Sequence, residues 1–189
     1  MKSFVKALVL APAMLVALTA CQSKLSDEKA KERADGYKPA EVAEKYESVD
    51  VKSDVDVKKR TGVFAEDGLL AALVNTAIEA ATRDDKGLEP SAGIFVMSDA
   101  EQTDGVTLEY YSYKKTGLKI VVKTDMDQKE SGANIKITGT GNTYVLDDGR
   151  YEKGDSKVKM FVDANVGGVA FQGECEYTTK TVYTWHAAQ

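Results

Sequence analysis

Residues 106–123, VTLEYYSYKKTGLKIVVK, decide the fold class of this chain. Two runs rich in β-branched and aromatic residues, Val106–Lys115 and Leu118–Lys123, flank Thr116-Gly117, which is the pattern of a β-hairpin. Comparable strand-like runs follow along the chain, with turn residues between them and no helical pattern. Strands that are joined by short turns pair in antiparallel fashion. From Ala92 onward the sequence therefore predicts an antiparallel sheet.

The other predicted strands of this region are short, because turn signals interrupt them. The strands are Ile94–Met97, Asn134–Thr140, Thr143–Leu146, Lys157–Val162, Val169–Phe171 and Cys175–Trp185. The turns are Gly141-Asn142, Asp148-Gly149, Gly154-Asp155 and Gly167-Gly168, whose glycines allow tight backbone conformations. The pattern predicts a meander of about seven or eight strands.

Residues 39–83 change their hydrophobic period twice. Residues 39–49, PAEVAEKYESV, begin with proline and place apolar side chains at helical spacing, which predicts a short helix. Valines then alternate with charged residues from Val49 to Val57, which predicts a strand that ends at Thr61-Gly62. Residues 66–83 carry a broad apolar stripe at helical spacing, and this stripe predicts the longest helix.

These elements predict an α+β fold, in which a curved antiparallel sheet of about eight strands forms a half-barrel or open barrel. The long amphipathic helix packs on its concave face, after the short N-terminal helix. This order of elements is similar to that of the half-barrel folds of periplasmic lipoprotein carriers and related lipid-binding lipoproteins. The present chain departs from that order, since its long helix follows the first strand.

Residues 1–20 have the three parts of a secretory signal peptide. Lys2 and Lys6 are followed by an uncharged apolar run, Ala7–Leu18, and by small residues before Cys21. The run of about 12 residues is too short for a membrane-spanning helix, which needs roughly 20. The sequence therefore predicts a leader that is removed.

Leu18-Thr19-Ala20-Cys21 resembles the lipobox of bacterial lipoproteins. The resemblance implies diacylglyceryl transfer to the Cys21 thiol, cleavage before Cys21 and acylation, for example with palmitate, of the new amino group. Such a protein is held on a membrane through the lipid on Cys21. Gln22 is not aspartate, which implies the outer membrane if the host has one, and otherwise the outer face of a single membrane. The alternative is an ordinary secreted protein in which Cys21 has no special role.

The composition limits the partners of the mature chain. Residues 1–20 hold two lysines and no acid, so their removal lowers the formal charge from −5 to −7. An acidic chain disfavours nucleic-acid binding, which needs dense lysine and arginine. Residues 21–38 are predicted to be the lipidated cysteine and a charged spacer, since they offer no apolar face to bury. Residues 39–189 are predicted to form a single domain, with Cys175 as an unpaired core residue or, alternatively, a reactive or dimer-forming thiol.

The sequence contains no catalytic constellation. His186 is the only histidine, too few for a conventional zinc site or a histidine-based triad beside one free cysteine. Asp125–Glu130 starts like a calcium loop but has glutamate where glycine is needed, so it and Asp147–Gly149 are predicted to be solvated turns. Gly139–Asn142 lacks the lysine and helix of a phosphate cradle. We expect no catalytic residue, metal or cofactor.

Aromatic residues are the feature most typical of binding. On one predicted strand Tyr111 and Tyr113 share a face, and on the last strand Tyr177, Tyr183 and Trp185 do so. The two rows could line a concave pocket or an exposed recognition patch, as tyrosine and tryptophan do at interfaces. They could equally fill an ordinary core.

Three classes of function remain at this point. The first is a lipid-anchored, non-catalytic binding or interaction module of the cell envelope, whose partner would be an envelope protein. The alternative is a carrier or sensor of a lipid or other apolar ligand in the concave face of the sheet. An enzyme is the third class, and no residue pattern supports it.

Overall fold

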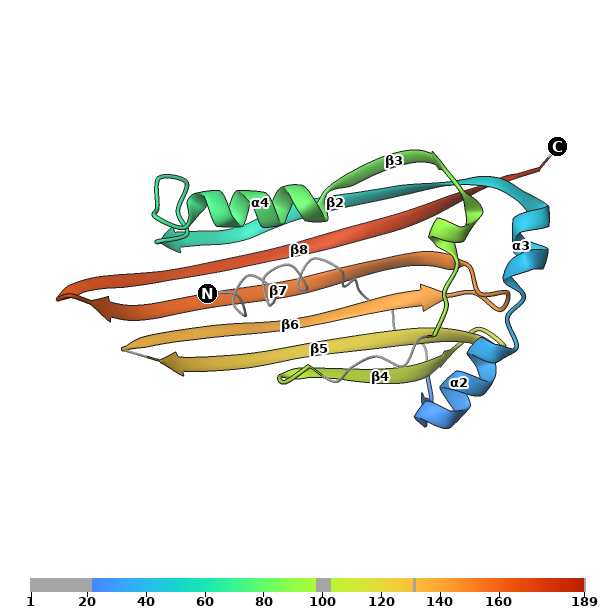
Figure 1. Cartoon of the computed structure of the whole chain (residues 1–189), viewed down its shortest axis with the longest axis horizontal. Coiled ribbons are helices and arrows are strands. Elements are labelled where there is room, and N and C mark those ends of the chain that lie inside the picture. Colours follow the sequence, from blue (N-terminus) through green and yellow to red (C-terminus); the bar gives the residue numbers. More distant parts are fainter. Residues whose placement is uncertain (1–21, 98–102, 131, 189) are drawn as a thin grey trace.

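The computed structural model describes residues 22–97, 103–130 and 132–188 of the chain. The predicted leader and Cys21 lie outside the described residues. The described chain forms one antiparallel sheet of eight strands in the order β1-β4-β5-β6-β7-β8-β2-β3 (Figure 1). In chain order the strands are β1 (Lys24–Leu25), β2 (Tyr46–Gly62), β3 (Arg83–Leu88), β4 (Val106–Tyr113), β5 (Gly117–Glu130), β6 (Ala133–Val145), β7 (Tyr151–Val166) and β8 (Val169–Ala187).

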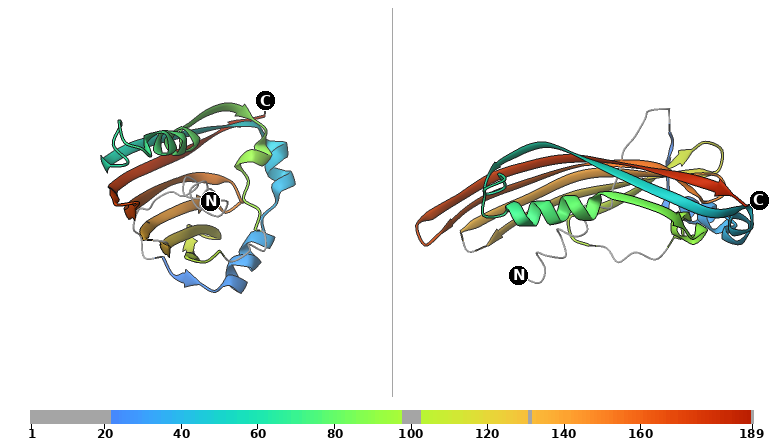
Figure 2. Two further views of the ribbon diagram at one scale, coloured as in Figure 1. Left: turned by 60° about the vertical axis from the view of Figure 1, so that its left-hand side comes forward. Right: turned by 90° about the horizontal axis from the view of Figure 1, so that it is seen from above.

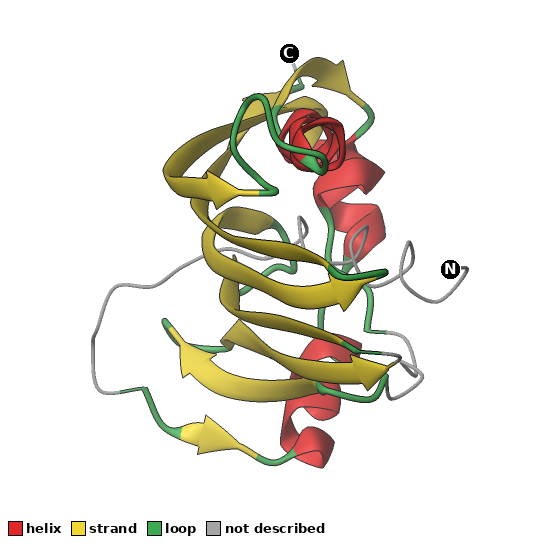
Figure 3. Ribbon diagram, turned by 90° about the vertical axis from the view of Figure 1, so that its left-hand side faces the viewer, coloured by secondary structure: helices red, strands yellow, loops and turns green. Residues whose placement is uncertain are grey.

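The sheet is open, with β1 and β3 at its two edges, and the predicted antiparallel α+β fold of about eight strands is confirmed. Within the described residues, three α-helices and one 3-10 helix accompany it, namely α2 (Asp27–Asp35), α3 (Pro39–Lys45), α4 (Ala71–Ala81) and η2 (Pro90–Gly93). Figures 2 and 3 show that the α-helices lie on one side of the curved sheet. None of the helices within the described ranges is long and apolar enough to span a membrane.

The strands are longer than predicted because several predicted turns are strand interior. Gly141-Asn142 lies within β6 and Gly154-Asp155 within β7, where both segments pair with a strand on each side. Two ladders of hydrogen bonds override the local turn preference of glycine in a central strand. For the same reason, residues 169–185 form one strand rather than two. The predicted turns at Asp148-Gly149 and Gly167-Gly168 are confirmed.

Two further strand predictions were wrong at the periphery of the sheet. Ile94–Met97 forms no strand, and only Ile94 makes an isolated bridge, to Arg150. Arg83–Leu88 is an edge strand that the sequence did not indicate. Its charged residues give no apolar alternation, and a charged edge is a common way to prevent pairing with other molecules.

Both predicted helices are shorter in the structure. α4 begins at Ala71 because residues 66–70 form turns, in which Leu70 donates its N–H to the carbonyl of Val63 at 2.7 Å. α3 ends at Lys45 because Tyr46 enters β2, where β8 supplies backbone partners. Pairing along an existing strand thus prevails over weak helical periodicity.

The two faces of the sheet can be assigned from the strand register, because directly paired residues share a face. The inner face is the one that α4 covers, where Val74 packs against residues such as Val158, Met160 and Tyr177. A second cluster on the same face joins α2 to β4, β5 and β6 through Ala30, Tyr37, Tyr110, Leu118, Ile120 and Val145. The alternate residues of each strand form the outer face.

Buried hydroxyl groups also lie on the inner face. Ser156 and Thr179 are hydrogen-bonded at 3.1 Å between their side-chain oxygens, and Ser53 is hydrogen-bonded to Thr181. All four are at most 6% exposed. Their mutual hydrogen bonds satisfy polar atoms that burial would otherwise leave unpaired.

The predicted spacer, residues 22–38, is part of the fold, and the expectation that it has no face to bury was wrong. β1 pairs with β4, and Ser26 caps α2 by accepting the N–H of Lys29. Ala30 is fully buried and Ala34 packs against the same cluster. A pair of alanines one turn apart lets a highly charged helix approach the sheet closely, because the charged side chains can point away from it.

Candidate functional site on the outer face

The two predicted aromatic rows lie on opposite faces of the sheet. Tyr111 is paired with Lys119, Lys119 with Tyr144, Tyr144 with Lys153, and Lys153 with Val182. Tyr111 therefore shares the outer face with Val182, and the next residue, Tyr183, has the inner face. The rows cannot line one pocket together.

The inner row is built into the core. Tyr177 is 1% exposed, and its burial raises the pKa of its hydroxyl to about 12. Tyr183 stacks on Tyr151 with ring centroids 5.3 Å apart. Trp185 packs edge-on against Tyr46 at 5.2 Å and donates its ring N–H to the carbonyl of Tyr151 at 3.0 Å. These contacts show that Tyr177, Tyr183 and Trp185 pack within the inner face of the sheet.

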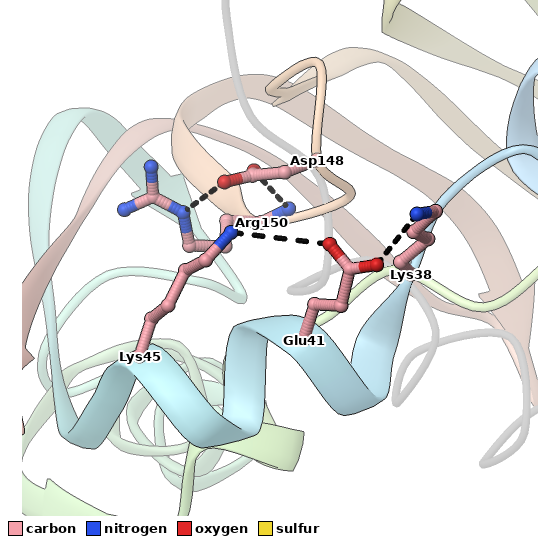
Figure 4. A network of polar contacts seen from close by, with 5 residues as sticks. All are labelled: Lys38, Glu41, Lys45, Asp148 and Arg150. Carbon is pink, nitrogen blue, oxygen red and sulfur yellow. Dashed lines mark hydrogen bonds and ion pairs between the residues drawn. The ribbon is translucent and has the colours of Figure 1, made fainter.

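A charged network holds the end of the sheet beside Trp185. The guanidinium of Arg150 lies 4.4 Å from the ring centre of Tyr46 and binds Asp148 at 2.8 Å. Figure 4 shows this pair facing α3. There Glu41 accepts a hydrogen bond from Lys38 at 2.5 Å and forms an ion pair with Lys45 at 4.0 Å. Each of these carboxylates has a cationic partner within the network, which is typical of a structural role.

The outer row is larger than predicted, because Tyr144 joins it. The rings of Tyr113 and Tyr144 pack edge-on with centroids 4.7 Å apart. Lys119 lies between rings, with its ammonium nitrogen 5.7 Å from the centre of Tyr111 and 5.9 Å from that of Tyr144. Lys153 approaches Tyr144 at 5.3 Å. The side chains come from four different strands, so the register of the sheet assembles this group.

A β-bulge contributes to this arrangement. The pairing of β6 with β7 shifts between Tyr144 and Val145, so that Glu152 is an extra residue beside Lys153. Glu152 accepts a hydrogen bond from the hydroxyl of Tyr113, while Lys153 lies near Tyr144. A bulge lets two consecutive residues serve the same face, which regular alternation would forbid.

Asp155 lies next along β7 on the outer face. Its Oδ1 atom is buried and has no hydrogen-bond partner in the described structure. Burial raises the pKa of its carboxyl group to about 6, although the positive charges of Lys180, Lys119 and Lys153 oppose this shift. Burial also lowers the pKa of Lys119. We call Tyr111, Tyr113, Tyr144, Lys119, Lys153, Asp155 and Lys180 the tyrosine–lysine cluster.

The lysines of this cluster differ from the other lysines of the outer face. Within the described ranges, Lys119, Lys153 and Lys180 have no carboxylate within ion-pair distance. The neighbouring lysines are paired across strands, as shown by Lys123 with Glu109, Lys136 with Asp125, and Lys157 and Lys159 with Glu176. Two of these cations, Lys119 and Lys153, lie beside tyrosine rings, and the third, Lys180, lies near Asp155. Three cations without ion pairs can therefore accept an external anion.

The pocket beside α2 is lined by side chains that stabilise a turn of the sheet. A pocket of about 420 Å³ lies beside α2, but its Arg33 donates to the carbonyl of Gly117 at 2.9 Å and its Tyr37 to that of Thr116 at 3.2 Å. Asp147, on the same pocket, accepts the N–H groups of Thr116 and Gly117. These bonds fix the turn between β4 and β5.

The residues considered for catalysis or metal binding have structural contacts. His186 lies 3.0 Å from Asp50, whose pKa is lowered by hydrogen bonds from the Gly87 N–H and from His186. The acidic run 125–130 is not a solvated turn but part of β5. Cys175 is fully buried, and burial raises the pKa of its thiol. In the part of the chain that is described, no three His, Cys, Asp or Glu side chains are grouped to hold a metal ion.

Sequence reasoning found Tyr111 and Tyr113 but missed the rest of the cluster. The turn predicted at Gly141-Asn142 separated Tyr144 from the strand on which it lies. An unbroken alternation from Asn134 to Val145 was the signal that could have placed Tyr144 on a regular strand. The register between strands and the bulge at Glu152 have no equivalent signal in the sequence.

Comparison with known proteins gives no relative for this arrangement. No protein family, curated protein or solved structure matches the chain. The chemistry of the site is therefore argued from its own residues.

Proposed function

We propose that this chain is a lipid-anchored lipoprotein of the cell envelope and that its domain is a non-catalytic binding module. The lipobox-like residues Leu18–Cys21 support the anchor. The binding surface is formed by the lysines of the tyrosine–lysine cluster, two of which lie over the buried ring of Tyr144, and its partner carries an anionic group such as phosphate. The observation that carries this proposal is the convergence of Lys119, Lys153 and Lys180, without ion pairs, on a face where the other lysines have them.

The inner face supports a carrier of apolar molecules less well. Its two apolar clusters are filled by side chains of the helices, such as Val74 of α4 and Ala30 of α2. Buried hydroxyl groups, including Ser156 and Thr179, interrupt the apolar surface of β7 and β8. An acyl chain favours a continuous apolar lining, because each buried CH₂ contributes about 0.8 kcal/mol.

The anchor is tested by expressing the full chain and measuring its mass and membrane association. We expect cleavage before Cys21 and added acyl chains, and the variant Cys21→Ala should lose both the lipid and the membrane association. Intact mass without acyl chains, or membrane association of Cys21→Ala equal to that of the wild type, would contradict the anchor.

The binding surface is tested with tripolyphosphate as the probe, titrated calorimetrically into the acylated protein in zwitterionic detergent. Replacing Lys119, Lys153 and Lys180 together by alanine should weaken binding by about tenfold or more, since each is a desolvated or unpaired cation. The matched control replaces Lys129, Lys136 and Lys157, which are ion-paired. Both variants lose three positive charges, so equal weakening would show a general charge effect and contradict a specific site.

A further inference from the structure

The chain enters the sheet immediately after the proposed lipid anchor. Ser112 of β4 donates its N–H to the carbonyl of Ser23 at 2.9 Å, and the side-chain oxygens of the two serines are 3.1 Å apart. Lys24 is then paired with Tyr111 and binds Glu109 at 2.8 Å. Among the described residues, Ser23 is thus the first that bonds to the sheet, two positions after Cys21.

This connection leaves almost no tether. Two residues span at most about 7 Å, because an extended chain advances by 3.3–3.6 Å or so per residue. A flexible linker of the 18 or so residues predicted for the spacer would allow roughly 20–25 Å. A lipid on Cys21 therefore holds the β1–β4 edge close to the headgroup layer, within about one Debye length at physiological salt.

The charges at this edge differ between the two sides of the sheet. On the outer side, five lysines face three acids, a balance of +2. The lysines are Lys24, Lys114, Lys119, Lys123 and Lys153, and the acids are Glu109, Glu152 and Asp155. On the inner side, α2 (DEKAKERAD) holds four acids and three bases, a balance of −1. An anionic leaflet therefore attracts the outer side and slightly repels the helix.

We infer that the mature domain rests on its own membrane through the β1–β4 edge, and that the nearby part of the tyrosine–lysine cluster contacts anionic phospholipid headgroups. This inference rests on the lipid anchor proposed above. The membrane leaflet is then the partner of the tyrosine–lysine cluster, and the domain has one orientation on the membrane. Lysine and tyrosine suit this place, because both present an apolar body and a polar end to the membrane interface.

Depth-dependent quenching of a fluorophore tests this orientation. The acylated chain is reconstituted into vesicles of phosphatidylcholine alone or with 30% or so phosphatidylglycerol, each containing a headgroup-level quencher lipid. One label is placed at Lys115→Cys, in the exposed turn between β4 and β5, and the matched label at Lys86→Cys, exposed on β3. The two edges are about 30 Å apart across the sheet, given strand spacings near 4.8 Å. Cys175 is fully buried and does not compete for label in the folded protein.

We expect strong quenching at Lys115→Cys, little at Lys86→Cys, and a larger difference in the anionic vesicles. Replacing Lys114, Lys119 and Lys153 by alanine should reduce quenching in anionic vesicles to the level seen in neutral ones. Inserting about 20 glycine and serine residues between Gln22 and Ser23 should weaken quenching in neutral vesicles, since such a linker reaches roughly 25 Å. Thermal unfolding of each variant verifies that the fold is retained.

The possible failures are distinguishable. Equal quenching at the two labels in an acylated protein would overturn the orientation and leave the anchor standing. Quenching that is the same in both vesicle types and insensitive to the lysine substitutions would overturn headgroup contact, even if tripolyphosphate binding still depended on the cluster. A chain without acyl groups would overturn the anchor and this inference together.

Discussion

The two faces of the sheet use the same strands for different purposes. The inner face carries residues such as Tyr177 and Leu118, which are at most 1% exposed and packed against helices. The outer face carries lysines, tyrosines and acids on the alternate positions of those strands, with no helix over them in the described structure (Figure 3). Most of these side chains are half-buried or exposed, whereas Tyr144 is 1% exposed. The difference teaches that alternation places the larger contributions to stability on the inner face and the charged groups on the outer face, so the size of a substitution's effect on stability should follow its face.

The largest effect is expected in the inner core. Leu118→Ala removes a fully buried side chain from the cluster beneath α2 and should lower the free energy of unfolding by about 2–5 kcal/mol, because the cavity cannot fully collapse. Denaturant unfolding measures this change. Val182→Ala, on the outer face and 54% exposed, should change it by about 0.5 kcal/mol or less. Equal losses for the two variants would contradict the assignment of faces.

A somewhat smaller effect is expected where α2 meets the inner face. Ala30→Glu places a carboxylate at a fully buried position and should lower the free energy of unfolding by about 2 kcal/mol or more. The loss cannot exceed the free energy with which α2 packs on the sheet, because the helix would then detach. Limited proteolysis should then cut within residues 26–38 faster. Lys29→Glu, at an exposed position of the same helix, is the control. If protease resistance were unchanged in Ala30→Glu, residues 26–38 would behave as the independent spacer that the sequence predicted.

On the outer face, Glu109 joins β1 to the sheet by accepting Lys24, Lys123 and the hydroxyl of Tyr111. Hydrogen bonds from Lys123, Lys24 and Tyr111 lower its pKa to about 2, below the ordinary value of 4.5. Its ionised form therefore stabilises the fold above pH 4.5, and this contribution is lost as the pH falls toward 2. Glu109→Gln should lower the free energy of unfolding by about 1 kcal/mol or less at neutral pH and should leave it unchanged near pH 2. Thermal unfolding of the variant and the wild type across this pH range measures the difference. A constant cost at every pH would contradict this role.

The smallest effect is expected for Asp155, and it has the opposite sign. Burial raises its pKa to about 6, above the ordinary 3.8, so the folded state holds a proton more tightly than the unfolded state. Stability from this group is therefore greatest below pH 3.8 and falls as the pH rises through 6. Asp155→Asn should remove this dependence and slightly raise the melting temperature at pH 7.5. A lower melting temperature at pH 7.5 would show that the ion attraction to the nearby lysines outweighs burial.

The candidate site shows where sequence reasoning ends. Alternation along one strand placed Tyr111 and Tyr113 on a common face, because the side-chain period of a strand is fixed by its backbone. It could not join them to Tyr144 or Lys153, since that requires the register between strands. Asp155 gave no signal, because its burial depends on its neighbours across the sheet.

The sequence by itself determined the antiparallel sheet, the hairpin at Thr116-Gly117 and the turns at Asp148-Gly149 and Gly167-Gly168, since local period and turn chemistry suffice for these. The tertiary structure alone decided that Gly141 and Gly154 continue strands, because flanking ladders supply hydrogen bonds that a turn would lose. It also decided that residues 22–38 fold onto the sheet. Their charged sequence contains only a few small apolar side chains, and these become stabilising only where β4 and β5 already present a surface to cover.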